Sequence, residues 1–149
     1  MGCISLANFA ILVNGIPSSF FPATHSITQG CPLSPLLFIM LIEGLSLLIA
    51  EARRIGKLKG IKISPQLFLT HLLFVDDVLL FGMGTFDDWM AFKEILDTFC
   101  EASGMCISSN KSYFFHNDLD EDLLKIISSI LTYKFDFLNK GFVYLGYFL

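Results

Sequence analysis

Asp76 and Asp77 are the residues whose type and spacing most clearly allow chemistry in this sequence. They are adjacent, and apolar runs at 72–74 and 78–81 flank them on both sides. Neighbouring carboxylates repel each other, and a buried pair keeps its charge only if a cation neutralises it. Mg²⁺ suits this role because it binds carboxylate oxygens together with water and substrate phosphates. The pair is therefore a candidate site for a divalent cation at the tip of a buried hairpin.

A structural interpretation of the same dipeptide stays open. Asp is common in tight turns because its side chain forms hydrogen bonds with nearby backbone groups. Asp87-Asp88 illustrates this alternative, since it follows Thr85 at the expected start of a helix, where carboxylates act as caps and favour the helix dipole. The acidic pair alone does not decide between metal binding and a simple turn.

Short segments rich in apolar β-branched and aromatic residues predict the strands that position this pair. Strands at 67–74 and 78–81 are expected on either side of the acidic turn. Asn14-Gly15 predicts a β-hairpin with arms at 9–13 and 16–21. Further strands are expected at 61–63, at 105–107 and 113–115 flanking the loop 108–112, and as a final strand or hairpin arm at 142–149.

Three helices follow from capping residues and apolar spacing. The Ser-Pro pair at 34–35 is a suitable start for a mostly buried amphipathic helix that ends near Arg54. Thr85 begins a second helix, which ends before Gly104 and carries Trp89, Phe92, Leu96 and Phe99 at helical spacing. A third helix is expected at 119–131. These elements predict an α+β fold, an antiparallel sheet with helices packed on one face.

The composition narrows the classes of protein. The chain has 149 residues, 54% of them hydrophobic and 16% charged, with sixteen Phe. This composition excludes intrinsic disorder, and four Cys are too few for a disulfide scaffold in a chain of this length. The net charge of −4 argues against binding nucleic acid through a basic surface of its own. A membrane protein, a core-rich soluble domain and a piece of a larger domain remain.

The segment 36–50 is the best candidate for a membrane span. It is shorter than the about 20 apolar residues that a span requires, and Pro35 and Glu51 bound it. Glu43 near its centre would cost roughly 2.5–3.5 kcal/mol in a bilayer. We therefore expect this segment to be a helix packed within the protein, not a membrane span, and we expect no membrane partner. The N-terminus has no secretory signal pattern, and the cysteines show no CxxC pair, so reduced thiols without a zinc site are expected.

Five segments, in order, resemble the reverse transcriptase family, most closely its non-LTR retrotransposon branch from plants. The Phe74-Val75-Asp76-Asp77 segment is similar to the family's [FY]-x-D-D box, and residues 29–35 are similar to its Q-G-x-P-L-S-P motif. The other three are Val13-Asn14-Gly15 with Pro17, Phe20 and Phe21; Gly104-Met105-Cys106-Ile107 with Lys111-Ser112; and Tyr144-Leu145-Gly146.

The resemblance implies an RNA-directed DNA polymerase palm, in which a primer 3′-hydroxyl attacks a deoxynucleotide between two Mg²⁺ ions. By resemblance, Asp76 and Asp77 hold the metal and are catalytic, and Lys111 approaches the nucleotide phosphates. Residues of the nucleotide site are Gln29, Gly30 and Phe74, and those of the primer grip are Tyr144, Leu145 and Gly146. The implied partners are an RNA template, a DNA primer and deoxynucleotides.

The resemblance also implies a partial domain. Residues 1–149 correspond to a palm from before the Q-G-x-P-L-S-P motif to the primer grip, without the fingers, the first catalytic Asp motif or the thumb. We expect such a chain not to polymerise alone, and a partner chain could cover its exposed apolar surface. The alternatives are a non-catalytic, decayed retroelement product and a small membrane protein. A working retroelement enzyme would act in the nucleus, but no Lys/Arg-rich import sequence is present.

Overall fold

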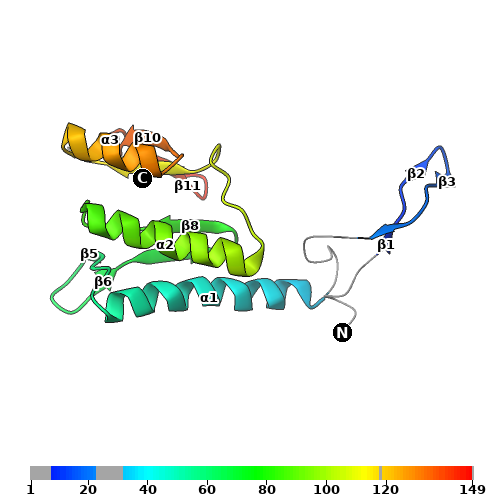
Figure 1. The fold of residues 1–149 in the computed structure, drawn as a ribbon, viewed down its shortest axis with the longest axis horizontal. Coiled ribbons are helices and arrows are strands. Elements are labelled where there is room, and N and C mark those ends of the chain that lie inside the picture. Colours follow the sequence, from blue (N-terminus) through cyan, green and yellow to red (C-terminus); the bar gives the residue numbers. More distant parts are fainter. Residues whose placement is uncertain (1–7, 23–31, 118, 149) are drawn as a thin grey trace. The chain divides into compact units, whose positions relative to one another are not determined.

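The computed structural model describes residues 8–22, 32–117 and 119–148, so the predicted site residues Gln29 and Gly30 lie outside it. The chain divides into two compact units, Met1–Gly44 and Leu45–Leu149, which are treated separately. The described residues contain three α-helices and short two-stranded sheets, five antiparallel and one parallel (Figure 1). The predicted α+β class is confirmed.

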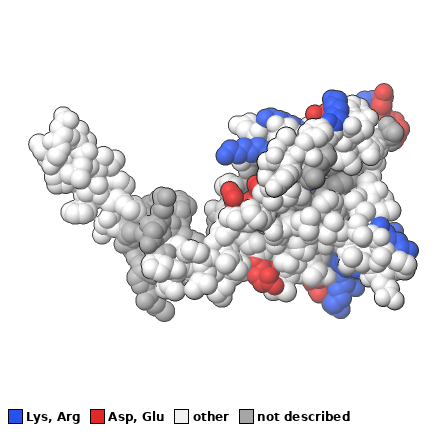
Figure 2. Space-filling model, turned by 180° about the vertical axis from the view of Figure 1, so that it is seen from behind, with Lys and Arg blue, Asp and Glu red and all other residues white. Residues whose placement is uncertain are grey.

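The first unit contains a nested β-hairpin. Strand β1 (Asn8–Phe9) pairs with β4 (Phe21–Pro22), and β2 (Leu12–Val13) pairs with β3 (Ile16–Pro17). Asn14 and Gly15 join the inner strands with φ of 51° and 80°, the two positive values that a type I′ turn requires. The predicted hairpin is confirmed, with shorter strands than expected. Glu43 is the unit's only Lys, Arg, Asp or Glu in the sequence, and its described hairpin carries no charge colour in Figure 2.

Helix α1 (Ser34–Arg54) begins and ends where the sequence predicts. In the second unit its buried residues are Leu45, Ile49 and Ala52, spaced along one face. Leu47 is 61% exposed, so the expectation of a mostly buried helix is wrong for this part of the chain. Helix α1 is long and apolar enough to cross a membrane, judged by length and composition only. The core helix of a soluble protein meets the same criterion.

Two short antiparallel pairs follow α1. Strand β5 (Ile61–Lys62) pairs with β6 (Phe68–Leu69), and β7 (His71–Phe74) pairs with β8 (Asp77–Leu80). The sequence predicted one strand over 67–74, but the pairing changes at Thr70, whose carbonyl accepts a hydrogen bond from the Phe81 N–H at 2.8 Å. Gly60 has φ of +72°, and a Cβ there would lie 2.6 Å from the Leu69 carbonyl oxygen, so only glycine fits this close approach.

Helix α2 (Phe86–Ser103) has both predicted ends. The Thr85 hydroxyl accepts a hydrogen bond from the Asp88 N–H at 3.3 Å, and Gly104 ends the helix with φ of 71°. Its buried apolar residues are Ala91, Phe92, Ile95 and Phe99. Of the expected apolar face, Phe92 and Phe99 are buried, whereas Trp89 and Leu96 are half-buried.

Asp88 does more than the predicted capping. Its side chain is 2% exposed and accepts hydrogen bonds from the backbone N–H of Met83 at 2.9 Å and of Lys59 at 3.4 Å. One carboxylate thus satisfies backbone donors from two loops that meet the start of α2. Asp87, its neighbour, is exposed and fits the predicted dipole role.

A parallel β-α-β unit follows α2. Strand β9 (Tyr113–His116) pairs in parallel with β10 (Lys134–Phe137), and α3 (Glu121–Ile130) connects them (Figure 1). The expected strand at 105–107 is wrong, because those residues form a loop, and β10 was not predicted. Phe114 packs with Ile127 and Leu131 in the core beneath α3, and the Trp89 ring meets the Phe114 ring edge-on at 4.6 Å.

Burial raises the pKa of Tyr133, which packs against the same core. The folded chain therefore holds its phenol proton more tightly than the unfolded chain does. Stability from this residue is complete below pH about 10 and is lost as the pH rises through the folded pKa. Tyr133→Phe should reduce the alkaline loss of the free energy of unfolding, measured in urea between pH 9 and 11. An unchanged alkaline slope would contradict this role.

The hydrogen bonds of Asp88 predict a large effect of its removal. Asp88→Ala leaves the N–H groups of Met83 and Lys59 without their acceptor, and should lower the free energy of unfolding by about 2–4 kcal/mol. Asp88→Asn retains one acceptor oxygen and should cost less. The matched control Asp87→Ala, one residue away and exposed, should cost under about 1 kcal/mol. Urea unfolding measures all three, and equal losses for Asp87→Ala and Asp88→Ala would be inconsistent with this role.

Candidate functional site

The acidic hairpin closes through a two-residue turn. Phe74 pairs with Asp77, so Val75 and Asp76 are the two central residues. Val75 has φ of 53°, a left-handed conformation that β-branched residues rarely adopt. A positive φ at the first central position is typical of type II′ turns, where glycine is preferred. The turn that carries the acidic pair is therefore strained, as is common at functional sites.

Asp76 and Asp77 are both exposed, and within the described residues neither side chain takes part in a hydrogen bond or ion pair. Phe74 and Val75 beside them are 52% and 66% exposed. The prediction of a buried hairpin tip is therefore wrong for the structure as described. Two adjacent carboxylates whose oxygens are all accessible form a donor set that fits a hard divalent cation with water in its remaining positions.

The described residues supply only part of a metal site. They contain no group of three or more His, Cys, Asp or Glu side chains that could hold a metal ion. Mg²⁺ is commonly bound by one or two carboxylates, with waters and substrate phosphates completing the octahedron. Asp76 and Asp77 could provide the protein ligands of such a site.

His71 anchors the opposite end of the hairpin. Its Nε2 hydrogen-bonds with the Ser46 hydroxyl of α1 at 2.9 Å, and its Nδ1 with the Thr70 hydroxyl at 3.0 Å. Both ring nitrogens are bonded, which fixes the orientation of the imidazole and ties β7 to α1. Sequence reasoning missed this residue. The available signal was a histidine that interrupts an otherwise apolar run.

Lys111 lies in a tight turn between α2 and β9. Its N–H donates to the Ser108 carbonyl at 3.0 Å, and the Ser112 hydroxyl donates to the same carbonyl at 2.8 Å. Lys134 of β10 donates from Nζ to the Asn110 carbonyl at 2.6 Å, which holds the turn against the sheet. The Lys111 residue is exposed, and within the described part of the chain its amine forms no hydrogen bond or ion pair. Its charge is free to meet an anionic ligand.

The Tyr144-Leu145-Gly146 segment forms a second turn in which a residue other than glycine has a positive φ, as Val75 does in the acidic hairpin. Strand β11 (Val143–Tyr144) pairs with β12 (Tyr147–Phe148), and Leu145 and Gly146 join them with φ of 52° and 83°. The hairpin alternative for 142–149 is confirmed as far as Phe148. Tyr144 is half-buried and Leu145 is exposed.

The structure connects some of the predicted site residues and leaves others apart. Phe74, Asp76 and Asp77 share one hairpin. Within residues 32–117 and 119–148, no side-chain hydrogen bond or ion pair joins this hairpin to Lys111 or to the 144–146 turn.

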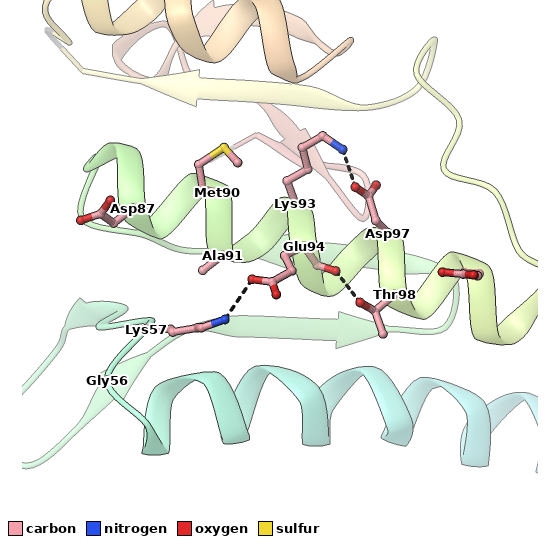
Figure 3. Close-up of a pocket in the computed structure, with 10 residues that line it drawn as sticks. Gly56, Lys57, Asp87, Met90, Ala91, Lys93, Glu94, Asp97 and Thr98 are labelled. Carbon is pink, nitrogen blue, oxygen red and sulfur yellow. Dashed lines mark hydrogen bonds and ion pairs between the residues drawn. The ribbon is translucent and has the colours of Figure 1, made fainter.

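A shallow groove of about 700 Å³ lies along α2, away from all of these residues (Figure 3). The Lys57 Nζ meets the Glu94 Oε2 at 3.0 Å across it, and Lys93 pairs with Asp97 on its α2 side. These pairs are solvent-exposed, so each adds little stability. Two of its acids, Glu94 and Asp97, are paired with lysines, and the groove contains none of the residues that the sequence marked for metal, nucleotide or primer binding.

Comparison with known proteins gives two matches. The family described as "Reverse transcriptase (RNA-dependent DNA polymerase)" matches residues 3–149. An uncharacterized mitochondrial protein of Arabidopsis thaliana is 42% identical over 69 residues, which are 44% of this chain and 55% of that protein. The chain thus spans about half the length of the curated relative it matches.

The strained turn predicts an unusual response to glycine. A left-handed conformation costs a residue with a side chain roughly 1–2 kcal/mol, and glycine adopts it without this cost. Val75→Gly should therefore leave the free energy of unfolding unchanged or raise it. Val78→Gly, in β8 of the same hairpin, should lower it by roughly 1 kcal/mol, because glycine weakens a regular strand. Urea unfolding compares the two variants. An equal loss in both would show that Val75 is not strained.

Proposed function

Because the chain belongs to the reverse transcriptase family, whose model matches residues 3–149, we propose that it is a polymerase palm segment for template-directed nucleotidyl transfer. The observation that carries the proposal is the family match together with the acidic pair on a two-residue turn between paired strands. The substrates in this proposal are an RNA template, a DNA primer and deoxynucleotides.

In the proposal, Asp76 and Asp77 hold Mg²⁺. Their carboxylates are exposed, adjacent and without a cationic partner among the described residues, which supports this role. When bound, the metal supplies positive charge that activates the primer hydroxyl and neutralises the transferred phosphate. His71 fixes the far end of strand β7 through Ser46 and Thr70, and the two-residue turn keeps both carboxylates at the tip of the hairpin.

The remaining predicted residues receive roles by family position. Lys111 donates charge to the nucleotide phosphates, and its exposed, unpaired amine is compatible with that role. Gln29, Gly30 and Phe74 contact the incoming nucleotide. Tyr144, Leu145 and Gly146 support the primer strand, and their type I′ turn offers a rigid edge for it.

We further propose the plant non-LTR retrotransposon branch as the source of this domain. Its five motifs occur here in the branch's order, and the matched curated relative is a plant protein. The two carboxylates are proposed to bind metal without supporting polymerisation alone, because a two-metal site needs further ligands.

Metal binding at the acidic pair can be tested directly. Mn²⁺ is a paramagnetic probe for Mg²⁺ sites, and it should broaden the amide signals of residues 75–78 at substoichiometric concentration in NMR spectra of the chain. The double variant Asp76→Asn, Asp77→Asn should abolish the broadening, because asparagine side chains lack the anionic oxygens that the ion needs. The control Asp87→Asn, also an exposed acid beside a second Asp, should leave it unchanged. Equal broadening in all variants would contradict a site at the pair.

Primer extension tests the activity. The purified chain with Mg²⁺, an RNA template and a DNA primer should incorporate no deoxynucleotide by itself. Incorporation that disappears in the Asp76→Ala, Asp77→Ala variant would contradict the inferred need for further ligands, and would establish the chain as a polymerase. Incorporation that survives in that variant would contradict the catalytic role of the pair.

A further inference from the structure

Asn14 and Gly15 form the tip of the inner hairpin in the first unit, and the proposed polymerase chemistry does not use them. Asn14 is exposed, and within the described residues its side-chain amide takes part in no hydrogen bond. In the same part of the chain the Gly15 N–H donates to no acceptor. A Cβ added to Gly15 would meet no atom within 4 Å, so the space around this peptide bond is open. A side-chain amide and the next peptide nitrogen are thus both unprotected.

The strands that hold this turn closed are short. Strands β2 and β3 pair over two residues each, and every residue from 11 to 22 is exposed. The Ser18 N–H donates to the Ile11 carbonyl at 2.8 Å, and the Ser18 hydroxyl accepts from the Ile11 N–H at 3.0 Å. A two-stranded hairpin with so little buried surface is only marginally stable, so the free energy of its local opening is low.

Opening of the hairpin brings two reactive groups within reach of each other. In the closed turn Asn14 and Gly15 have φ of 51° and 80°, and the pairing of Val13 with Ile16 fixes their backbone. In the opened turn, rotation about ψ and χ1 of Asn14 can place the Gly15 nitrogen against the side-chain carbonyl carbon, Cγ. Glycine favours this approach because it has no Cβ and its backbone is the least restricted.

We propose that Asn14-Gly15 is a site of spontaneous covalent modification, with water as the co-reactant. The Gly15 nitrogen loses its proton to hydroxide and attacks Asn14 Cγ, and the new C–N bond closes a five-membered imide ring. The bond from Cγ to the side-chain nitrogen breaks, and that nitrogen leaves as ammonia with a proton taken from water.

Water then opens the imide by adding to one of its two carbonyl carbons. If the bond from the ring nitrogen to Cγ breaks, the product is aspartate. If the bond to the backbone carbonyl carbon of Asn14 breaks, the product is isoaspartate, in which the chain continues through the side-chain carbon. In both cases one water is consumed and one ammonia is released, and no oxidant or reductant is needed.

Both products place a carboxylate at the tip of the hairpin. Glu43 is the only Lys, Arg, Asp or Glu of the first unit in the sequence, so the modification adds charge to a hairpin that carries none. Isoaspartate also lengthens the backbone by one carbon atom. A two-residue turn sets the strand register, so this product should disrupt the pairing of Val13 with Ile16. Aspartate tolerates the left-handed conformation and should retain the turn.

The test follows the full chain over time in mildly alkaline buffer. Mass spectrometry of the digested chain measures the replacement of the side-chain NH₂ by OH at each asparagine, and electron-transfer fragmentation distinguishes isoaspartate from aspartate. The other asparagines are internal controls, because none of them precedes glycine: Asn8, Asn110, Asn117 and Asn139. We expect Asn14 to be modified faster than each of these, to give both products, and to lose the modification in Asn14→Gln.

A matched pair of variants tests the role of the hairpin. Ser18→Ala removes the hydroxyl that accepts from the Ile11 N–H, and should speed the modification of Asn14 by roughly twofold to tenfold, towards its rate in urea. Ser19→Ala keeps that bond, because only the Ser19 carbonyl contacts Ser18, and should leave the rate unchanged. An unchanged rate at Asn110 in both variants excludes global unfolding as the cause.

Two results would overturn the proposal. A rate at Asn14 no faster than at the other asparagines would show that this turn is not a modification site. A rate at Asn14 that Ser18→Ala and urea both leave unchanged would show that opening of the hairpin does not control the reaction.

Discussion

The buried carboxylate of Asp88 is the constraint on which the second unit depends. A charged group with 2% exposure is tolerated only when its oxygens are satisfied, and here the donors come from the backbone of Met83 and Lys59. Met83 follows β8, and Lys59 lies between α1 and β5, so both loops must meet the first turn of α2. Because β8 ends at Leu80, shortly before Met83, this requirement also fixes the end of β8 near the start of α2.

The hairpin itself is held at one end and strained at the other. His71 bonds through both ring nitrogens to Ser46 and Thr70, while Val75 adopts a left-handed conformation at the turn. A strained turn persists only when its surroundings hold it in place, and the anchored strand provides that support. Asp76 and Asp77 therefore lie at the end of the hairpin away from its anchor, and both are exposed.

Charge and apolar surface are unevenly distributed along the chain. All Lys and Arg residues, and every acid except Glu43, belong to the second unit by sequence, whereas the described hairpin of the first unit exposes large apolar side chains such as Leu12 and Ile16. The polar groups that matter to the fold are also few and specific. Asp88 and His71 form internal bonds, while the charged pairs along α2 are exposed and add little to stability.

The sequence by itself determined the three helices, both ends of α2, the Asn14-Gly15 turn and the acidic hairpin, because caps, glycines and apolar spacing act locally. Its motifs also indicated the family. Only the tertiary structure decided the roles of Asp88 and His71, since their partners lie in other segments of the chain. It also decided the parallel pairing of β9 with β10, where local pattern favoured a hairpin over 105–115. Parallel strands need a crossover connection, and here the burial of Phe114 against α3 selects the distant partner strand over the adjacent segment.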